Sequence, residues 1–500
     1  MYLEVKNFGP IKSGKIDLSK KFYVFVGYNN SGKTYMAHLM WIIFHPAAHS
    51  KFVDYVANNK QVDKFVNIKK IEAEGCFEIT PSFVRELLNE FSDFIKNELS
   101  GEILHVEKEH FIVNDLSIAF KFSRNNNVTK YVKNKNHSFL KIMESKSRGK
   151  TKQRLVELVK KKNALKIEIR ENNRPRDKEI LTLLSGDGFD EKEGLKKSVL
   201  LSTMAILFNR EKPFYLSATR MFYPSFYEYI FRYEKERRKE LEEKLSDILA
   251  SKGNLDKNIE EVVRASKSKY TAPMDALMTR MYRLNEKVPA PSEAYEPFFR
   301  SLEDIIGGEI VIKRKEGIAP AEFFLRIGKD KEKELEMCLS SSSVNQLASL
   351  YLFLKYWAEE NNNFLIVDEP EENVHPKNQI ALLDLLIKFV NQNDNRVLLT
   401  THSPLLTSAL NNHLYLGILK GHRVDTERII ERNSLDISPD TELTDKDTAI
   451  YFFNGNRIFS YEIDEYGVLF SDFRSQFDKI KRIAEVLTDE IYELEEKEED

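Results

Sequence analysis

Hydrophobic and polar positions alternate over the first residues of the chain and then change to a helical period. The stretches YLEVKNF (2–8) and GKIDL (14–18) alternate as half-buried strands do, and FYVFV (22–26) is a continuous apolar run typical of a buried strand. From Thr34 on, TYMAHLMWIIFH carries its apolar residues at helical spacing. The pattern predicts a small β region that leads through a short loop into a helix.

The same kind of pattern returns after residue 339. Helical spacing in VNQLASLYLFLKYWAEE (344–360) is followed by the buried strand NFLIVDEP (363–370), the helix NQIALLDLLIKFVNQ (378–392) and the strand RVLLTTHSP (396–404). Alternating helices and strands of this kind predict a parallel sheet with helices packed on it.

The pattern in the middle of the chain predicts helices and strands that are added to this sheet. Residues 219–262 are strongly helical and charged, and a helix over 223–250 would form a protruding arm of about 42 Å at ~1.5 Å per residue. A Pro-rich connector (289–297) precedes two more strand patterns, GGEIVIKRK and AEFFLRI. Near the C-terminus, AIYFFNGNRIFSYEIDEYGVLF predicts a small strand pair, and the last 15 or so residues are acidic and are expected to fray.

Composition is that of a protein with two or three domains. The chain has 500 residues, 42% of them hydrophobic and 31% charged, and its net charge is −3. Two distant cysteines, Cys76 and Cys338, fit a reducing compartment. The first residues do not resemble a signal peptide, and no apolar run approaches the ~18 residues of a membrane span. We expect a cytoplasmic protein without a membrane partner.

One segment departs from this charge balance. Residues 121–180 hold 19 Lys and Arg against 6 Asp and Glu. Such a run is more often a solvated surface than a binding site, and a patch for nucleic acid or an acidic partner is the alternative. Aromatic residues are sparse here, which disfavours stacking on single strands.

The loop GYNNSGKT between the predicted strand and helix has the GxxxxGK[ST] spacing of a phosphate-binding loop. Its glycines let backbone N–H groups turn towards a phosphate at the positive end of the helix. Lys33 would reach the β- and γ-phosphates and act in catalysis, and the Thr34 hydroxyl would ligate Mg²⁺. The residues expected to bind ATP here are Gly27, Asn29, Asn30, Ser31, Gly32, Lys33 and Thr34.

Two further strands end in polar residues. The strand 363–368 ends at Asp368, which could hold Mg²⁺, and is followed by Glu369, which could polarise an attacking water. The strand 396–401 is followed by His402, which could hydrogen-bond the γ-phosphate and report on its presence.

A serine run, CLSSSSVNQL, lies about 25 residues before Asp368. Serines at a helix N-terminus are good caps, and they can equally present hydroxyl and N–H groups to an anion. The anion-binding candidates are Ser341, Ser342, Ser343 and Asn345.

In this order the four elements resemble the heads of ABC-type ATPases. The resemblance covers about 1–45 and 335–420 and implies an α/β fold in which a mixed sheet with flanking helices is interrupted by a long, mostly helical insertion. It also implies ATP and Mg²⁺ bound between two subunits, with the serine run of one acting on the ATP of the other. The protein would then be a homo-oligomer, at least a dimer and on this resemblance up to a hexamer.

The resemblance narrows at VKNFGPIKSGKIDL, YLSATR, LEDIIGGEI and DEPEENVHPKNQ with TTHSPLL. These are similar to the stand-alone OLD-like ATPases of the AAA15 and AAA21 types in bacterial anti-phage defence, with the ATPase subunits of the PARIS and Septu systems as the nearest types. The resemblance implies an ATP-hydrolysing switch or scaffold that holds and releases or activates a separate effector, such as a nuclease, in response to a nucleic-acid or phage-protein trigger. A DNA-repair or DNA-maintenance ATPase of the RecF and Rad50 kind is the alternative.

Two departures from that pattern bear on function. Ser343 stands where the signature commonly carries glycine, which permits close backbone approach to the γ-phosphate. In YLSATR, Ser217 and Thr219 replace a proline and an acidic residue that relatives often show. Arg220 remains, and it could contact phosphate or a neighbouring subunit, or form a structural ion pair.

Full-length OLD proteins add a metal-dependent nuclease domain after the histidine-bearing strand. Such a domain would need a Glu after one strand and an Asp-x-Asp pair after another. The tail contains the Asp-x-Asp pair Asp445 and Asp447, but the surrounding stretch is polar with no apolar strand before it, so a loop or helix cap is expected there. We therefore expect no intrinsic nuclease.

These readings divide the chain into five parts: an N-terminal part of the ATPase head (1–50), an α/β segment with the basic patch (51–215), a helical arm (216–300), a C-terminal part of the head (301–460), and a C-terminal strand or helix with the acidic tail (461–500).

Overall fold

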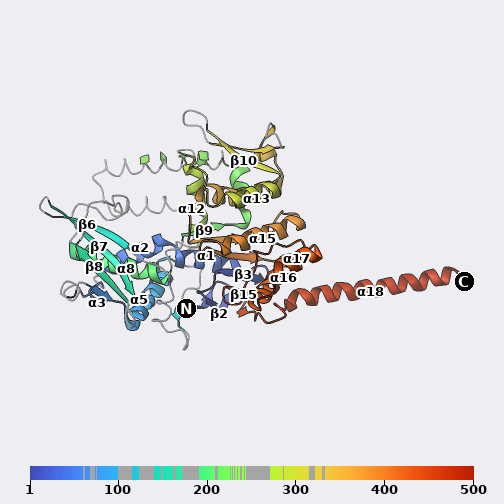
Figure 1. The fold of residues 1–500 in the computed structure, drawn as a ribbon, viewed down its shortest axis with the longest axis horizontal. Coiled ribbons are helices and arrows are strands. Elements are labelled where there is room, and N and C mark those ends of the chain that lie inside the picture. The colour runs from blue at the N-terminus through green and yellow to red at the C-terminus, as the bar shows by residue number, and fades with distance from the viewer. Residues whose placement is uncertain are drawn as a thin grey trace.

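The protein is described by a computed structural model (Figure 1). The described residues are 1–59, 62–67, 76–99, 115–122, 140–147, 150–160, 165–171, 191–208, 212–225, 271–284, 287–314, 321–328 and 333–499, with a few isolated positions, mostly between 227 and 243. Most of the predicted arm over 223–250 and much of the basic segment 121–180 lie outside them. No described helix is both long enough and apolar enough to span a bilayer.

A six-stranded mixed sheet forms the centre of the molecule. Its strand order is β16-β15-β3-β14-β13-β9, and all neighbours are parallel except β15 and β16. The strands are β3 (Phe22–Gly27), β9 (Lys212–Leu216), β13 (Asn363–Asp368), β14 (Arg396–Thr401), β15 (Thr448–Phe453) and β16 (Ile458–Ser460). The predicted mixed α/β fold is confirmed, and so is the strand pair near the C-terminus, which extends this sheet.

Both faces of the central sheet are covered, because its strands are apolar on both sides. In β3, Tyr23 and Phe25 enter one buried cluster, whereas Phe22, Val24 and Val26 enter the other. This period of two explains why the central strands appear in the sequence as continuous apolar runs rather than as alternating ones.

Three antiparallel sheets surround the centre. They have the strand orders β2-β1-β5, β10-β11-β12 and β4-β8-β7-β6. Their strands are β1 (Tyr2–Phe8), β2 (Ile11–Asp17), β5 (Ser117–Lys121), β10 (Gly308–Lys313), β11 (Glu322–Ile327), β12 (Lys333–Glu336), β4 (Cys76–Glu78), β6 (Leu140–Ser147), β7 (Lys150–Lys160) and β8 (Leu165–Glu171).

Helices pack on both faces and at the edges (Figure 1). They are α1 (Lys33–Phe44), α2 (Pro46–Asn58), α3 (Val62–Phe65), α5 (Pro81–Phe94), α8 (Glu191–Leu207), α9 (Phe222–Ser225), α12 (Ala272–Arg283), α13 (Glu296–Ile306), α14 (Ser342–Leu352), α15 (Pro376–Asn391), α16 (Pro404–Gly421), α17 (Thr426–Asn433) and α18 (Ser471–Glu499). Short 3₁₀ turns span Ala218–Met221 and Met337–Leu339, and π-helical turns span Ile95–Leu99 and Phe353–Trp357.

The acidic C-terminal stretch differs from the prediction. It does not fray but forms the second half of α18, a helix of 29 residues. Most of its residues are good helix formers, and an ion pair such as that between Lys481 and Glu485, four residues apart, stabilises a helix. Fraying was predicted from the acidic charge of the stretch, without regard to the regularly spaced apolar residues within it.

Candidate nucleotide-binding site

The loop between β3 and α1 approaches its neighbours so closely that two of its positions require glycine. Gly27 has φ of 150°, and a Cβ there would lie 2.1 Å from the backbone oxygen of Phe453 in β15. Gly32 has φ of 96° just before α1, where a Cβ would lie 2.8 Å from the Ile11 side chain. The glycines that sequence analysis assigned to phosphate binding are thus also the residues that let the loop fold between β2 and β15.

Lys33 lies at the start of α1 with its ammonium group turned back over the loop. Its Nζ donates hydrogen bonds to the backbone oxygens of Gly27, at 3.1 Å, and Tyr28, at 2.9 Å, and the residue is 5% exposed. Burial lowers the pKa of Lys33 to about 8, against the opposing effect of nearby carboxylates, chiefly Glu369. Among the described residues no carboxylate forms an ion pair with Lys33, and a phosphate at the loop would supply that negative charge.

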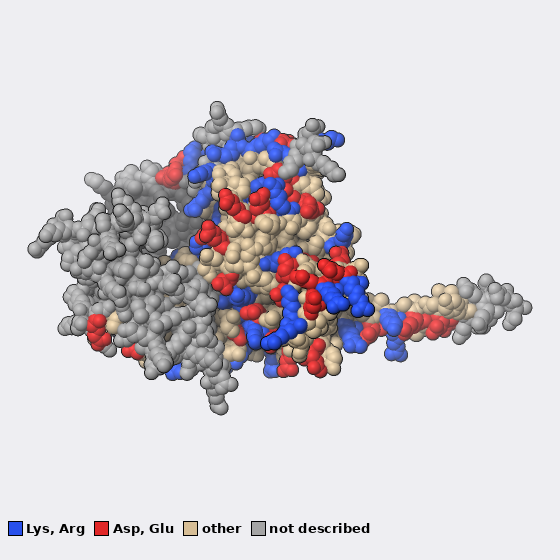
Figure 2. All heavy atoms as spheres, in the orientation of Figure 1, with Lys and Arg blue, Asp and Glu red and all other residues tan. Residues whose placement is uncertain are grey.

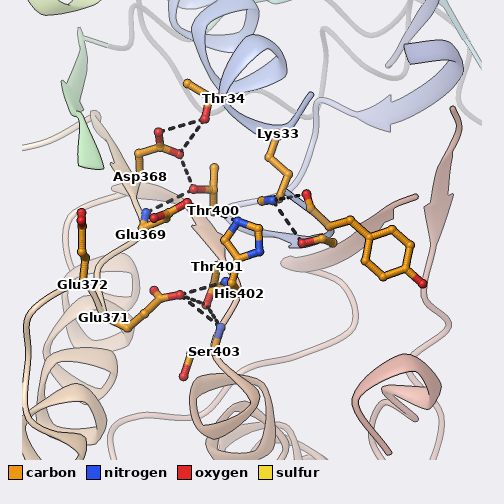
Figure 3. A network of polar contacts seen from close by, with 12 residues as sticks. Lys33, Thr34, Asp368, Glu369, Glu371, Glu372, Thr400, Thr401, His402 and Ser403 are labelled. Atoms are coloured by element: carbon orange, nitrogen blue, oxygen red, sulfur yellow. Dashed lines mark hydrogen bonds and ion pairs between the residues drawn. The ribbon is translucent and has the colours of Figure 1, made fainter. Parts of the chain in front are cut away.

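Asp368 ends β13 and is held by three hydroxyl groups, of which Figure 3 shows those of Thr34 and Thr400. Thr34 Oγ1 lies 3.0 Å from Asp368 Oδ2, Tyr215 donates to the same oxygen at 3.1 Å, and Thr400 donates to Oδ1. Burial raises the pKa of Asp368, and the hydrogen bonds from Thr400 and Thr34 oppose this rise. The carboxylate is therefore fixed beside the first turn of α1, as predicted for a metal ligand.

Glu369 follows directly and leaves the strand in a left-handed conformation, with φ of 47°. Its N–H donates to the backbone oxygen of Thr400 at 3.0 Å, and its Oε1 lies 3.2 Å from Nε2 of His402. The hydrogen bond from His402 lowers the pKa of Glu369, so that the carboxylate stays ionised at neutral pH. Figure 3 shows that the side chains of Lys33, Glu369 and His402 converge although they come from three strand ends.

Strand order explains this convergence. In the central sheet β14 lies between β3 and β13, and the three strands are parallel. Their carboxyl ends therefore meet at one edge, where an open α/β sheet typically binds its ligand. The predicted loop, the acidic pair and His402 are brought together there.

A third carboxylate, which was not predicted from the sequence, holds the turn that carries His402. Glu371 Oε1 accepts hydrogen bonds from Thr401 Oγ1 at 2.6 Å and from the N–H groups of His402, at 2.8 Å, and Ser403, at 3.1 Å. Glu371 lies in the acidic turn after β13, so it fixes the end of one strand to the end of the next. Tyr215 and Thr400 were also missed, because an isolated polar residue at a strand end has no motif of its own.

Arg220 is at the centre of the same region but is 1% exposed. Its guanidinium donates to the backbone oxygens of Ser217, Gln346, Asp368 and Glu369, at distances of 2.6–3.2 Å. The sequence left two roles open for Arg220: contact with phosphate or a neighbouring subunit, and a structural ion pair. The first role does not fit a side chain that is enclosed by carbonyl groups of its own chain. Arg220 instead has a structural role, in which it joins the acidic turn to α14, although its partners are carbonyl oxygens rather than an ion-pair carboxylate.

The serine run caps α14. Ser341 Oγ accepts from the N–H of Val344 at 3.3 Å, and Ser341 and Ser342 are exposed. The amide nitrogen of Asn345 is buried and donates to Met337 O and Ser340 Oγ, both at 2.9 Å, so it holds the turn. In the described part of the chain no hydrogen bond joins these serines to the phosphate loop. Nucleotide contacts from the serine run and Asn345 stay a prediction.

The loop and its surroundings fit a Mg²⁺-bound nucleoside triphosphate. The hydroxyl of Ser31 is buried and has no hydrogen-bond partner among the described residues. Thr34 and Asp368 present the oxygen ligands that Mg²⁺ prefers. The pair Asp445 and Asp447 instead lies in a turn before β15, as expected from the sequence, with Lys20 donating to the backbone oxygen of Asp445.

Fold and site together define a nucleotide-binding protein with a phosphate loop. The family model of the AAA ATPase domain matches residues 1–407, which is well over half of the chain. The chain therefore belongs to the AAA ATPase domain family and is an ATPase.

More distant similarities are found among solved structures. The Smc head domain with an extended coiled coil bound to the C-terminal domain of ScpA, from Pyrococcus furiosus, shares 11% identity over 97% of this chain and 98% of that chain, with a TM-score of 0.29. The SMC head domain from Thermotoga maritima shares 12% identity over 92% and 98%, with a TM-score of 0.27. No curated protein matches the chain. Similarities this distant say nothing about substrate or partners.

Proposed function

We propose that the protein is the ATP-hydrolysing switch subunit of an anti-phage defence complex. It would hold a separate effector protein, a nuclease or toxin, and release or activate it according to its nucleotide state. The observation that supports the switch is the direct contact between Glu369, which follows Asp368 at the end of β13, and His402, which follows the neighbouring strand β14. The assignment to anti-phage defence rests on the motif resemblance.

Each residue of the site has a specific role in this proposal. Lys33 and the loop N–H groups would bind the β- and γ-phosphates, and Thr34 with Asp368 would hold Mg²⁺, which neutralises phosphate charge when bound. Glu369 would orient and polarise the attacking water, since its pKa is held low and it accepts a hydrogen bond from His402. His402 would also bond the γ-phosphate, so its position would differ before and after hydrolysis.

Because Ser341 and Ser342 are exposed and the serine run has no hydrogen bond to the loop of its own chain among the described residues, we infer that it acts on the ATP of a second copy. Two heads would then close on ATP and separate after hydrolysis. Ser343 in place of glycine would make that closure slower than in relatives with glycine at this position.

The experiment is to express the chain with the product of its neighbouring gene and to purify the complex with and without ATP. The proposal expects the two proteins to co-purify and their association to change between ATP and ADP. The purified ATPase alone should cleave neither DNA nor RNA. A chain that purifies without partner under both conditions would contradict the switch role.

A DNA-maintenance ATPase is the second candidate, favoured by the 19 Lys and Arg among residues 121–180. It expects duplex binding that weakens steeply with salt, and hydrolysis that DNA stimulates. Neutralising Lys160, Lys161, Lys162 and Lys166 together would then reduce binding. If DNA changes neither hydrolysis nor the mobility of the protein, this candidate is excluded.

A further inference from the structure

The C-terminal helix α18 leaves the body of the protein and extends away from it (Figure 1). Its base is anchored, because Phe470 is buried in the core and Phe473 packs against the same cluster. Beyond this point the described helix residues are exposed up to Tyr492. A helix that is fixed at one end and exposed from 474 to 492 presents a rigid surface to a partner.

That surface carries an apolar stripe with a coiled-coil period. Phe477, Ile480, Leu487 and Ile491 are 56%, 64%, 59% and 54% exposed, and with Phe473 and Ala484 they are spaced by alternating steps of four and three residues. This 3.5-residue period is that of the a and d positions that form the seam between two helices. Over the part of α18 that is not grey, Figure 2 shows uncharged residues along one side and charged residues, both basic and acidic, along the other.

The charge along the helix indicates what covers the stripe. Residues 474–482 hold four basic residues and one acidic residue, whereas residues 489–500 hold eight acidic residues and one basic residue. Two copies side by side in parallel would bring the two acidic ends together. Two antiparallel copies would instead place the basic stretch of each opposite the acidic stretch of the other, which is favourable on both sides of the pair.

We propose that α18 pairs with α18 of a second copy of this chain in an antiparallel coiled coil. The register that sets 474–482 against 489–497 also aligns the seam, because it pairs Ile480 with Ile491 of the partner and Ala484 with its Leu487. A small residue opposite a large one lets the helices approach closely at the centre. This interface contains no residue of the nucleotide site, so it forms with or without ATP and is separate from any ATP-dependent contact between the heads.

The first test is the mass of the full-length protein without nucleotide, measured by light scattering after gel filtration. We expect at least twice the 58.4 kDa of one chain. Leu487→Asp, at the centre of the seam, should halve the mass of the wild type. Val486→Asp is the matched control: it is the next residue, 53% exposed, receives the same charge, and points away from the seam, so it should keep the wild-type mass.

Circular dichroism and ATP binding of both variants keep the outcome interpretable. Loss of mass in Leu487→Asp with ATP binding unchanged supports the interface. A wild-type monomer at tens of micromolar, or equal masses for the two variants, overturns it. Neither result bears on hydrolysis at the nucleotide site, so failure of this proposal and failure of the proposed function are distinguishable.

The second test measures orientation. In a chain with Cys76→Ser and Cys338→Ser, we expect a mixture of Ile480→Cys and Ile491→Cys proteins to form a disulfide-linked dimer on mild oxidation, since the two positions face each other. Each variant alone should remain uncrosslinked. Crosslinking of each variant with itself instead would show a parallel pair and overturn the proposed arrangement. A different protein bound at the stripe would leave all three samples uncrosslinked and would equally overturn it.

Discussion

Arg220 gives a quantitative test of how the acidic turn is held. In Arg220→Met the side chain keeps similar length but loses its charge and all its donors. The wild-type guanidinium donates to four backbone oxygens, and at about 1.5 kcal/mol for each charge-assisted bond this contributes about 6 kcal/mol. Burial lowers the pKa of Arg220 to about 10, against the attraction of nearby carboxylates, chiefly Asp368. Because four bonds that share one side chain are not fully additive, the variant should lose about 3 to 6 kcal/mol of stability.

The assay is urea unfolding followed by fluorescence, with Arg300→Met as the control. Arg300 lies on the surface of α13 and pairs with Glu296 and Glu303, so its removal should cost no more than about 1 kcal/mol. Where Arg220→Met still folds, its kcat should fall about 100-fold with little change in ATP affinity, because the Asp368 and Glu369 carbonyls lose their anchor. A change in stability below about 0.5 kcal/mol, with kcat unaltered, would refute the reasoning.

Two further predictions concern charge at the site. Burial lowers the pKa of Lys33 to about 8, so ATP affinity should fall as the pH rises above about 8 and Lys33 loses its charge. The nucleotide-free protein should instead gain stability between about pH 8 and pH 10.5, because in this range only the unfolded chain keeps the proton on Lys33. A fluorescent ATP analogue titrated from pH 7 to 9.5 measures the first effect, and Lys33→Met should abolish it. Because burial raises the pKa of Asp368, Asp368→Asn should leave the nucleotide-free melting temperature equal or higher. The same variant should lose the stabilisation that Mg²⁺-ATP gives the wild type, and thermal melts with and without Mg²⁺-ATP decide this.

The central sheet and the core of the site could be predicted from the sequence because both depend on local signals. Continuous apolar runs marked β3, β13 and β14; β3 led into the GxxxxGK[ST] loop with Lys33, β13 ended in Asp368, and β14 was followed by His402. The order of these strands then determines which side chains meet. Lys33, Asp368 and His402 were found in this way.

The remaining features depend on contacts between segments far apart in sequence. Arg220 and Gln346 are 126 residues apart, and Tyr215 and Asp368 are 153 residues apart, so no local pattern could reveal that Arg220 is enclosed by carbonyl groups or that Asp368 receives a tyrosine hydroxyl. Glu371 was overlooked for a different reason, since three of the four residues from Glu369 to Glu372 are acidic and only the geometry distinguishes their roles. The heptad spacing of the apolar residues in α18 was also present in the sequence. It predicts a helix, whereas the prediction of a frayed end relied on the acidic charge alone.

The proposed switch depends most directly on Glu369 as the catalytic base. Single-turnover hydrolysis of ATP by Glu369→Gln tests this role. Glutamine keeps the size of the side chain but cannot take a proton from water, so the rate should fall about 10²- to 10⁴-fold while ATP affinity stays within a few-fold of the wild type. Glu360→Gln, an exposed substitution beyond the opposite end of β13, serves as the control and should keep the wild-type rate. Hydrolysis by Glu369→Gln at the wild-type rate would contradict the assignment of the catalytic base and, with it, the proposed mechanism of the switch.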